Sequence, residues 1–230
     1  MAHYFLPHHV HVCFAANRTI FLDMKRGTYF GLDPEKTELL RHALGESSAA
    51  EQAAPPIAAE LIGMGLLTTS RSASKTFLPP ATSAPEAPLL PLIDDRPKIS
   101  AARVLRFLVT CSAVALRLKF RPLDRSLTHL AHRKSRSTTS YIAEDAALAQ
   151  ARDLTRTFLH LRPFAYAARN RCLLDSLTLA EFLASYGIRS TCVFGVRANP
   201  FEAHCWLQIG SHVVNETPEM AQRYAPILSV

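Results

Sequence analysis

The sequence has no apolar run long enough to cross a membrane. The longest candidate, residues 104–120, is interrupted by Arg106, Arg117 and Lys119, whereas a spanning helix needs about 20 largely apolar residues. The first residues, MAHYF, also lack the basic segment and apolar stretch of a secretory signal. We therefore predict a protein without a membrane span that works in the cytoplasm.

Cysteine is scarce and is not arranged for a metal cluster. The 230 residues include five cysteines, and no two of them form a Cys-x-x-Cys pair. An odd number of dispersed thiols is typical of a reducing compartment and argues against a disulfide framework. The histidines at positions 8, 9 and 11 lie close together, but no ligands follow at the spacing of a zinc site. We expect no metal and no cofactor.

Proline is unevenly distributed. Six of the 15 prolines fall between Ser70 and Pro97, in a stretch that is also rich in Ser, Ala and Thr. This composition predicts a linker over residues 71–98, between a small domain at 1–70 and a larger one at 99–230. Hydrophobic residues make up 48% of the chain, which is enough to build a packed core.

The formal charge is +7, and the basic residues concentrate between Arg96 and Arg136. Nucleic-acid binding is one explanation for such a segment. However, the segment has no interleaved aromatic residues and no base-reading motif. We therefore expect no nucleic-acid partner, and favour a solvated basic face or a site for an acidic peptide.

The first 70 residues predict three strands followed by helices. Apolar and β-prone residues indicate strands at His9–Phe14, Thr19–Asp23 and Thr28–Leu32, with a turn at Met24–Gly27. Asp33-Pro34 is typical of a helix start, a second helix is expected from Pro56, and Leu66–Thr68 is a candidate closing strand. This order favours a winged-helix-like module. DNA binding is disfavoured, because neither helix carries a row of base-reading side chains.

The larger domain is expected to begin with helices and to end with strands. Helical periodicity predicts helices at Ser100–Phe120 and Ala143–Leu161, with a polar basic connector at Arg133–Ser140. A third helix is predicted from Cys172 to Tyr186, where Gly187 is a natural stop. The predicted strands that follow are Thr191–Val196, Ala203–Ile209 and His212–Glu216. The whole chain is thus predicted to be α+β.

Three residues of this domain form a candidate catalytic set. Cys172 begins a helix, where backbone amide groups stabilise a thiolate. His204 lies on a following strand and can take the thiol proton, and Glu216 on the next strand can orient the imidazole. Each residue alone has an ordinary explanation, as a buried thiol, a core histidine and an exposed carboxylate. Asn215 is a second candidate for the orienting role, and Asp175 is interpreted as polar support.

The turn between the last two strands decides whether this set can assemble. A two-residue loop at Gly210-Ser211 pairs Ile209 with His212 and would turn Glu216 away from His204, because side chains alternate along a strand. A three-residue loop or a bulge restores the shared face. We predict the second arrangement. Trp206 shares the strand face of His204 and is expected to shield the site or to pack beneath the substrate.

The first 70 residues resemble the PqqD-like peptide-recognition element of pathways that modify ribosomally made peptides. The resemblance rests on the hairpin FLDMKRGTYFGL at 21–32, the helix after it and LIGMGLL at 61–67. It implies that a leader peptide docks on the strand Thr28–Leu32. The expected binding residues there are Thr28, Tyr29, Phe30, Lys25 and Arg26. The alternative is that residues 1–70 only stabilise the rest of the protein.

The C-terminal part resembles the lasso-peptide B proteins of the McjB type. The strings CLLDSLTL (172–179), GIRSTCVFGVRANPFEAHCWL (187–207) and VVNE (213–216) carry the resemblance. It implies a papain- or transglutaminase-like cysteine protease that removes the leader of a lasso precursor, with Cys172 as nucleophile and His204 as base. Glu216 stands where the family usually has Asp.

The resemblance also implies partners, namely the precursor peptide and an ATP-dependent lasso cyclase. Two other functions remain open at this point. The same fold can transfer or cross-link amides, with an amine in place of water. Alternatively, the protein is a non-catalytic chaperone that delivers the precursor to the cyclase.

Overall fold

The computed structural model describes residues 4–43, 56–75, 79–90, 97, 99–136, 144–167 and 171–230. The chain divides into two compact units. The first contains residues 1–80 with 196–202 and 225–228, and the second contains residues 81–195, 203–224 and 229–230. Each unit has its own core.

The first unit contains a three-stranded antiparallel sheet in the order β2-β3-β4. Its strands are β2 (Val10–Ala15), β3 (Arg18–Asp23) and β4 (Thr28–Gly31), close to the three predicted. Ala16 and Asn17 form the first turn with positive φ angles of 44° and 61°, as the twist of a two-residue hairpin requires. β4 lies at an edge of this sheet.

Two helices cover the core of this unit. They are α1 (Pro34–Ala43) and α2 (Pro56–Gly63), and both begin where the sequence predicts. The Asp33 carboxylate accepts a hydrogen bond from the amide of Lys36 at 2.8 Å, as expected of an N-cap. Phe21, Leu40 and Leu61 are fully buried at the centre of the core.

The predicted strand at Leu66–Thr68 is wrong. Gly65 turns the chain with φ 75°, and the amides of Leu66 and Leu67 bond back to the carbonyl of Leu61 in helix α2. The residues therefore close the helix and bury their side chains, and only Thr68 makes a bridge, to Phe5. The short strands here are β1 (Leu6–Pro7) and β5 (Ser74–Lys75), which pair with each other.

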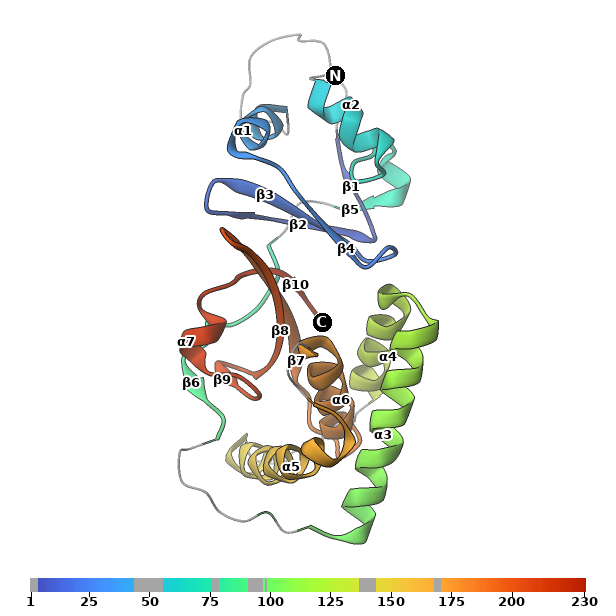
Figure 1. Ribbon diagram of the computed structural model, residues 1–230, viewed down its shortest axis with the longest axis vertical. Coiled ribbons are helices and arrows are strands. Elements are labelled where there is room, and N and C mark those ends of the chain that lie inside the picture. Colours follow the sequence, from blue (N-terminus) through green and yellow to red (C-terminus); the bar gives the residue numbers. More distant parts are fainter. Residues whose placement is uncertain are drawn as a thin grey trace. The chain divides into compact units, whose positions relative to one another are not determined.

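The second unit is built around helix α6 (Cys172–Ala184), which is buried along most of its length. Helices α3 (Ala101–Phe120), α4 (Leu123–Arg136) and α5 (Glu144–Ala165) all pack against it (Figure 1). The rings of Phe107, Phe158 and Phe182 meet at centroid distances of 5.5–6.4 Å and join α3, α5 and α6. The predicted helices over α3, α5 and α6 are confirmed.

Helix α4 was not predicted, and its last turn covers part of the expected connector at Arg133–Ser140. The helix starts after Pro122 and buries Leu127 and Leu130, three residues apart, on one face. Its short apolar stripe is obscured in the sequence by the basic residues around it. Residues 137–140 of the expected connector lie outside the described part of the chain.

Several basic residues of this region neutralise carboxylates of the same unit. Glu181 of α6 is buried, and it contacts Arg117 at 2.5 Å and Arg133 at 3.5 Å. Arg103 contacts Asp153 of α5 at 2.6 Å. The basic segment is thus partly a structural feature that ties α3 and α4 to their neighbours, because a buried carboxylate is costly unless it is paired.

The second sheet has five strands in the order β10-β7-β8-β9-β6. Its members are β7 (Thr191–Ala198), β8 (Phe201–Ile209), β9 (His212–Val213), β10 (Ala225–Ser229) and β6 (Ala87–Pro88). A short helix, α7 (Pro218–Ala221), separates β9 from β10. Strand β6 comes from the middle of the expected linker.

Much of the segment predicted as a linker is therefore ordered structure. β6 pairs in parallel with β9, and the amide of Leu89 donates to the carbonyl of Val213 at 2.7 Å. Because proline lacks an amide proton, Pro88 suits the edge position that β6 occupies. Of the expected linker, residues 76–78, 91–96 and 98 lie outside the described part.

The core around α6 gives a stability prediction. Phe182→Ala should lower the free energy of unfolding by about 3–5 kcal/mol, because it leaves a large cavity among three packed rings. The matched change Leu105→Ala removes an apolar side chain that is 64% exposed on α3, so its effect should stay within about 0.5 kcal/mol. Urea denaturation followed by circular dichroism measures both, and equal effects would contradict this account of the core.

Candidate active site

Cys172 is the first residue of helix α6, as predicted, and its thiol is partly exposed. The preceding residue, Arg171, has φ −128° and ψ 36° and makes no side-chain capping bond. The first amide groups of the helix are therefore left for other partners. Together with the helix dipole they favour a negative charge at this end of the helix.

His204 and Glu216 lie in hydrogen-bond contact. Nε2 of His204 is 3.0 Å from Oε2 of Glu216, and both side chains are about a quarter or less exposed. The other Glu216 oxygen accepts the amide of Thr217 at 3.0 Å, which fixes the carboxylate. Since Nε2 faces Glu216, Nδ1 is the ring nitrogen left to exchange a proton with the thiol.

The contact is made by a different route from the one expected. Ile209 pairs with His212 and Gln208 with Val213, so the loop is the two-residue Gly210-Ser211 turn, and the prediction of a longer loop or bulge is wrong. Regular pairing then ends at Val213. The chain bends over residues 214–216, which returns Glu216 to His204 without strand alternation.

The charge environment raises the pKa of His204 above its ordinary value of 6.5. The largest cause is its hydrogen bond with Cys172, burial acts in the opposite direction, and the contact with Glu216 adds to the increase. The protonated imidazole thus stabilises the folded state fully below pH 6.5, and this contribution is lost as the pH rises through the raised pKa. A thiol, an imidazole and a carboxylate are therefore electrostatically coupled here.

Two aromatic rings support the His204 imidazole. The centroid of Tyr224 lies 5.2 Å from that of His204, and the Trp206 ring is roughly parallel to the imidazole at 6.1 Å. Trp206 is only 1% exposed, and its indole N–H donates to Gln208. It is therefore buried against the imidazole, and its expected roles in shielding the site or packing beneath the substrate stay predictions.

Gly195 makes room for these rings. A Cβ atom at this position would lie 2.6 Å from the Trp206 ring and 2.7 Å from Cβ of Tyr224. Neither Gly195 nor Tyr224 was predicted as part of the site. The signal for Gly195 is a glycine inside an apolar strand, which often marks a close approach. Tyr224 follows a short helix and carries no comparable signal.

Asn215 does not contact His204, although it was the second candidate for the orienting role. Its side-chain oxygen accepts the amide of Leu207 at 2.9 Å. Glu216 is therefore the acidic residue placed to orient the ring. Cys192 and Cys205 are buried thiols, with their sulfur atoms 3.3 Å apart.

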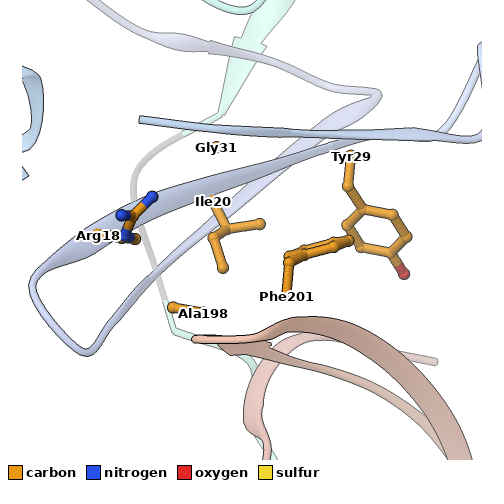
Figure 2. Close-up of a pocket in the computed structure, with 6 residues that line it drawn as sticks. All are labelled: Arg18, Ile20, Tyr29, Gly31, Ala198 and Phe201. Atoms are coloured by element: carbon orange, nitrogen blue, oxygen red, sulfur yellow. The ribbon is translucent and has the colours of Figure 1, made fainter. Parts of the chain in front are cut away.

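The expected leader-binding residues all belong to the first unit. Tyr29 and Phe30 alternate along β4: Phe30 packs against the core, and Tyr29 lines a pocket beside Phe201, with ring centroids 5.7 Å apart (Figure 2). Lys25 and Arg26 are exposed in the turn before β4. The Arg26 guanidinium also donates to the carbonyl of Met64, so Lys25 is the cleaner position for testing charge.

The described residues contain no group of three His, Cys, Asp or Glu side chains placed to hold a metal. Among the clustered histidines, His11 lies against Lys75, and burial together with that cation lowers the pKa of His11 to about 4. No helix in the described ranges is long and apolar enough to span a bilayer.

The sequence was compared with protein families, with characterised proteins and with solved structures. Residues 101–229 match the family model of the transglutaminase-like superfamily. The chain belongs to the transglutaminase-like superfamily. A stretch of 62 residues is also 34% identical to the microcin J25-processing protein McjB of Escherichia coli, covering 27% of this chain and 30% of that protein. No solved structure matches the chain.

The coupling of the three residues predicts a change in titration. Cys172→Ser should lower the pKa of His204 more than Glu216→Gln does, because the contact with Cys172 is the larger cause of its increase. Titration of the histidine Cε1 protons by NMR measures both shifts, with His204→Gln identifying the resonance. Equal downward shifts would contradict the ranking of the two contacts, and the absence of a downward shift in both variants would show that neither contact raises the pKa of His204 in solution.

Proposed function

We propose that this protein is a leader peptidase that cleaves a ribosomally made lasso-peptide precursor through Cys172, His204 and Glu216. The observation that carries the proposal is the His204–Glu216 contact beside a helix-start cysteine, in a transglutaminase-like domain. The partial similarity to a microcin-processing protein supports the substrate class. We further propose that cleavage takes place in the cytoplasm, with no cofactor.

In the first half of the reaction the Cys172 thiolate attacks the carbonyl carbon at the leader–core junction. The carbonyl π electrons move to oxygen and form a tetrahedral oxyanion. As it collapses, the C–N bond breaks and His204 donates its proton to the leaving amine, which leaves the leader as a thioester on Cys172. The amide of Cys172, at the uncapped helix start, is a candidate oxyanion donor.

In the second half water attacks the thioester. The neutral His204 now takes a proton from that water, and the C–S bond breaks. The leader is released as a free acid, and the Cys172 thiolate is regenerated. Glu216 keeps the imidazole in one orientation and stabilises its cationic form in both halves. It performs the task usually given to Asp in the family, and the bend at 214–216 sets its distance from the ring.

The first unit is proposed to be PqqD-like and to hold the leader. β4 is one of the two edge strands of the β2-β3-β4 sheet, and an extended peptide can add to such an edge through backbone hydrogen bonds. Thr28, Tyr29 and Phe30 belong to this strand, and Lys25 lies exposed at its start. Docking keeps a flexible leader at high local concentration near the protease.

The nucleophile is tested by mass spectrometry of precursor incubated with the purified protein, the proposed ATP-dependent cyclase and ATP. Cys172→Ala should abolish leader removal, and His204→Ala should be comparably inactive. Glu216→Ala should be milder, because the orienting residue contributes less than the base. Cys111→Ala is the matched control, since Cys111 is the other partly exposed thiol, and should cleave normally.

Each outcome of this experiment decides between the candidate functions. Substantial cleavage by Cys172→Ala would overturn the assignment of the nucleophile. A product in which an amine replaces water would identify amide transfer on the same fold. An unmodified precursor that binds but is never cleaved by the wild-type protein would identify a chaperone.

Leader docking is tested separately with the full-length Cys172→Ala protein and a synthetic leader peptide. If the leader is acidic, Lys25→Glu should weaken binding at least severalfold in calorimetry, because it reverses a charge beside the docking strand. Arg125→Glu makes the same change at an exposed position of α4 and should leave binding unchanged. No detectable binding by the parent protein at high micromolar leader would reject the docking role.

A further inference from the structure

Asp175 is a buried carboxylate one turn after Cys172. It is 5% exposed, and it accepts hydrogen bonds from Arg162 at 3.2 and 3.3 Å and from the Tyr166 hydroxyl at 3.1 Å. Burial, followed by the Asp175 charge, raises the pKa of Tyr166, so its hydroxyl remains a donor. These two partners offset the cost of burying the carboxylate. Arg162 lies in the last turn of helix α5, and Tyr166 is the residue just after it.

Asn215 connects this carboxylate to strand β8. Its amide nitrogen donates to Oδ2 of Asp175 at 3.4 Å and to Oγ of Ser176 at 3.0 Å. Its oxygen accepts the backbone amide of Leu207. The Asn215 side chain thus accepts the hydrogen bond that a backbone carbonyl of a neighbouring strand would otherwise accept, at the point where the β8–β9 pairing ends.

Ser176 completes the connection. Its hydroxyl donates to the carbonyl oxygen of Cys205 at 2.9 Å, and this bond is buried. The network therefore joins three backbone segments: the first turns of α6, the middle of β8 and the bend after β9.

Each member of the catalytic set is next to one of these attachments. Cys172 lies one turn before Asp175, His204 precedes Cys205, and Glu216 follows Asn215. We propose that Asp175 and Asn215 are positioning residues, which hold the nucleophile, the base and the orienting acid in register without touching the substrate. This inference rests on the proposed catalytic set and adds the device that aligns it.

The chemistry of the two side chains explains why one is an acid and the other an amide. An amide at 215 can accept from Leu207 while it donates to Asp175 and Ser176, whereas a carboxylate is only an acceptor. Asn215→Asp therefore keeps the bond from Leu207 but loses both donated bonds and places a second negative charge against Asp175. The loss of these two hydrogen bonds and the added charge are expected to displace the catalytic side chains and lower the reaction rate, because a displacement of about 1 Å can reduce the rate about 100-fold.

The test is the Asn215→Asp variant of the full-length protein, together with the exchanged pair Asp175→Asn/Asn215→Asp. A Cys111→Ala background leaves Cys172 as the partly exposed thiol, and its rate of alkylation by iodoacetamide is measured against pH. Leader cleavage is measured in parallel as kcat and KM. Asn17→Asp makes the same change in an exposed turn of the first unit and serves as the control.

Asn215→Asp should lower kcat at least tenfold with little change in KM, and should shift the pH profile of alkylation. The exchanged pair should recover a substantial part of kcat and of the original alkylation profile, because it restores one amide and one carboxylate in contact. An unchanged alkylation profile and kcat in Asn215→Asp, or an exchanged pair no better than the single variant, would overturn the proposal.

A milder variant keeps the test valid if Asn215→Asp does not fold. Ser176→Ala removes the link to Cys205 but introduces no charge, and should reduce kcat severalfold with a shifted alkylation profile. An unmoved profile in this variant would also reject the proposal. Because alkylation needs no precursor, a result there remains interpretable even if leader cleavage proves not to be the reaction.

Discussion

The arrangement of the second unit depends on one helix, α6, whose central residues 175–183 are buried while its first residues are partly exposed. Residues 175–183 of α6 are enclosed, whereas Cys172 remains partly exposed. Helices α3, α4 and α5 pack against α6, Ser176 bonds it to strand β8, and the Phe107–Phe158–Phe182 contacts hold it against α3 and α5. The packing of α6 therefore fixes the position of the Cys172 thiol, and it places the positive end of the helix dipole beside that thiol. The position of the proposed nucleophile is a result of the core.

The imidazole is held by different forces. Gly195 admits the Trp206 and Tyr224 rings, which limit how His204 can tilt, and Glu216 fixes its rotation. Dispersion sets the plane of the ring, and a charge-assisted hydrogen bond sets its orientation within that plane. The two constraints act on separate degrees of freedom, so neither can replace the other.

The sequence predicts the helices and most strands because their side-chain periodicity is local. It also predicts that Cys172 opens a helix, because a cysteine at the start of an apolar helical stretch is visible in one segment. The approach of Glu216 to His204 was predicted by the wrong route, since a bend after Val213 leaves no periodic signal. β6 escaped prediction because a two-residue edge strand with proline resembles a linker. Helix α4 escaped because basic residues interrupt its narrow apolar stripe. Tyr224 depends entirely on tertiary contacts.

The uncapped start of α6 has a consequence for how this protein responds to substitution. Arg171 contributes no capping bond, so the contribution of the helix start to the field at Cys172 comes from main-chain amides, which every residue type except proline supplies. If Cys172 and His204 act as proposed, a mutational scan would register both strongly, yet would not detect these backbone groups. Tolerance to substitution around position 172 therefore underestimates the contribution of this segment, because that contribution comes from backbone amides and not from side chains.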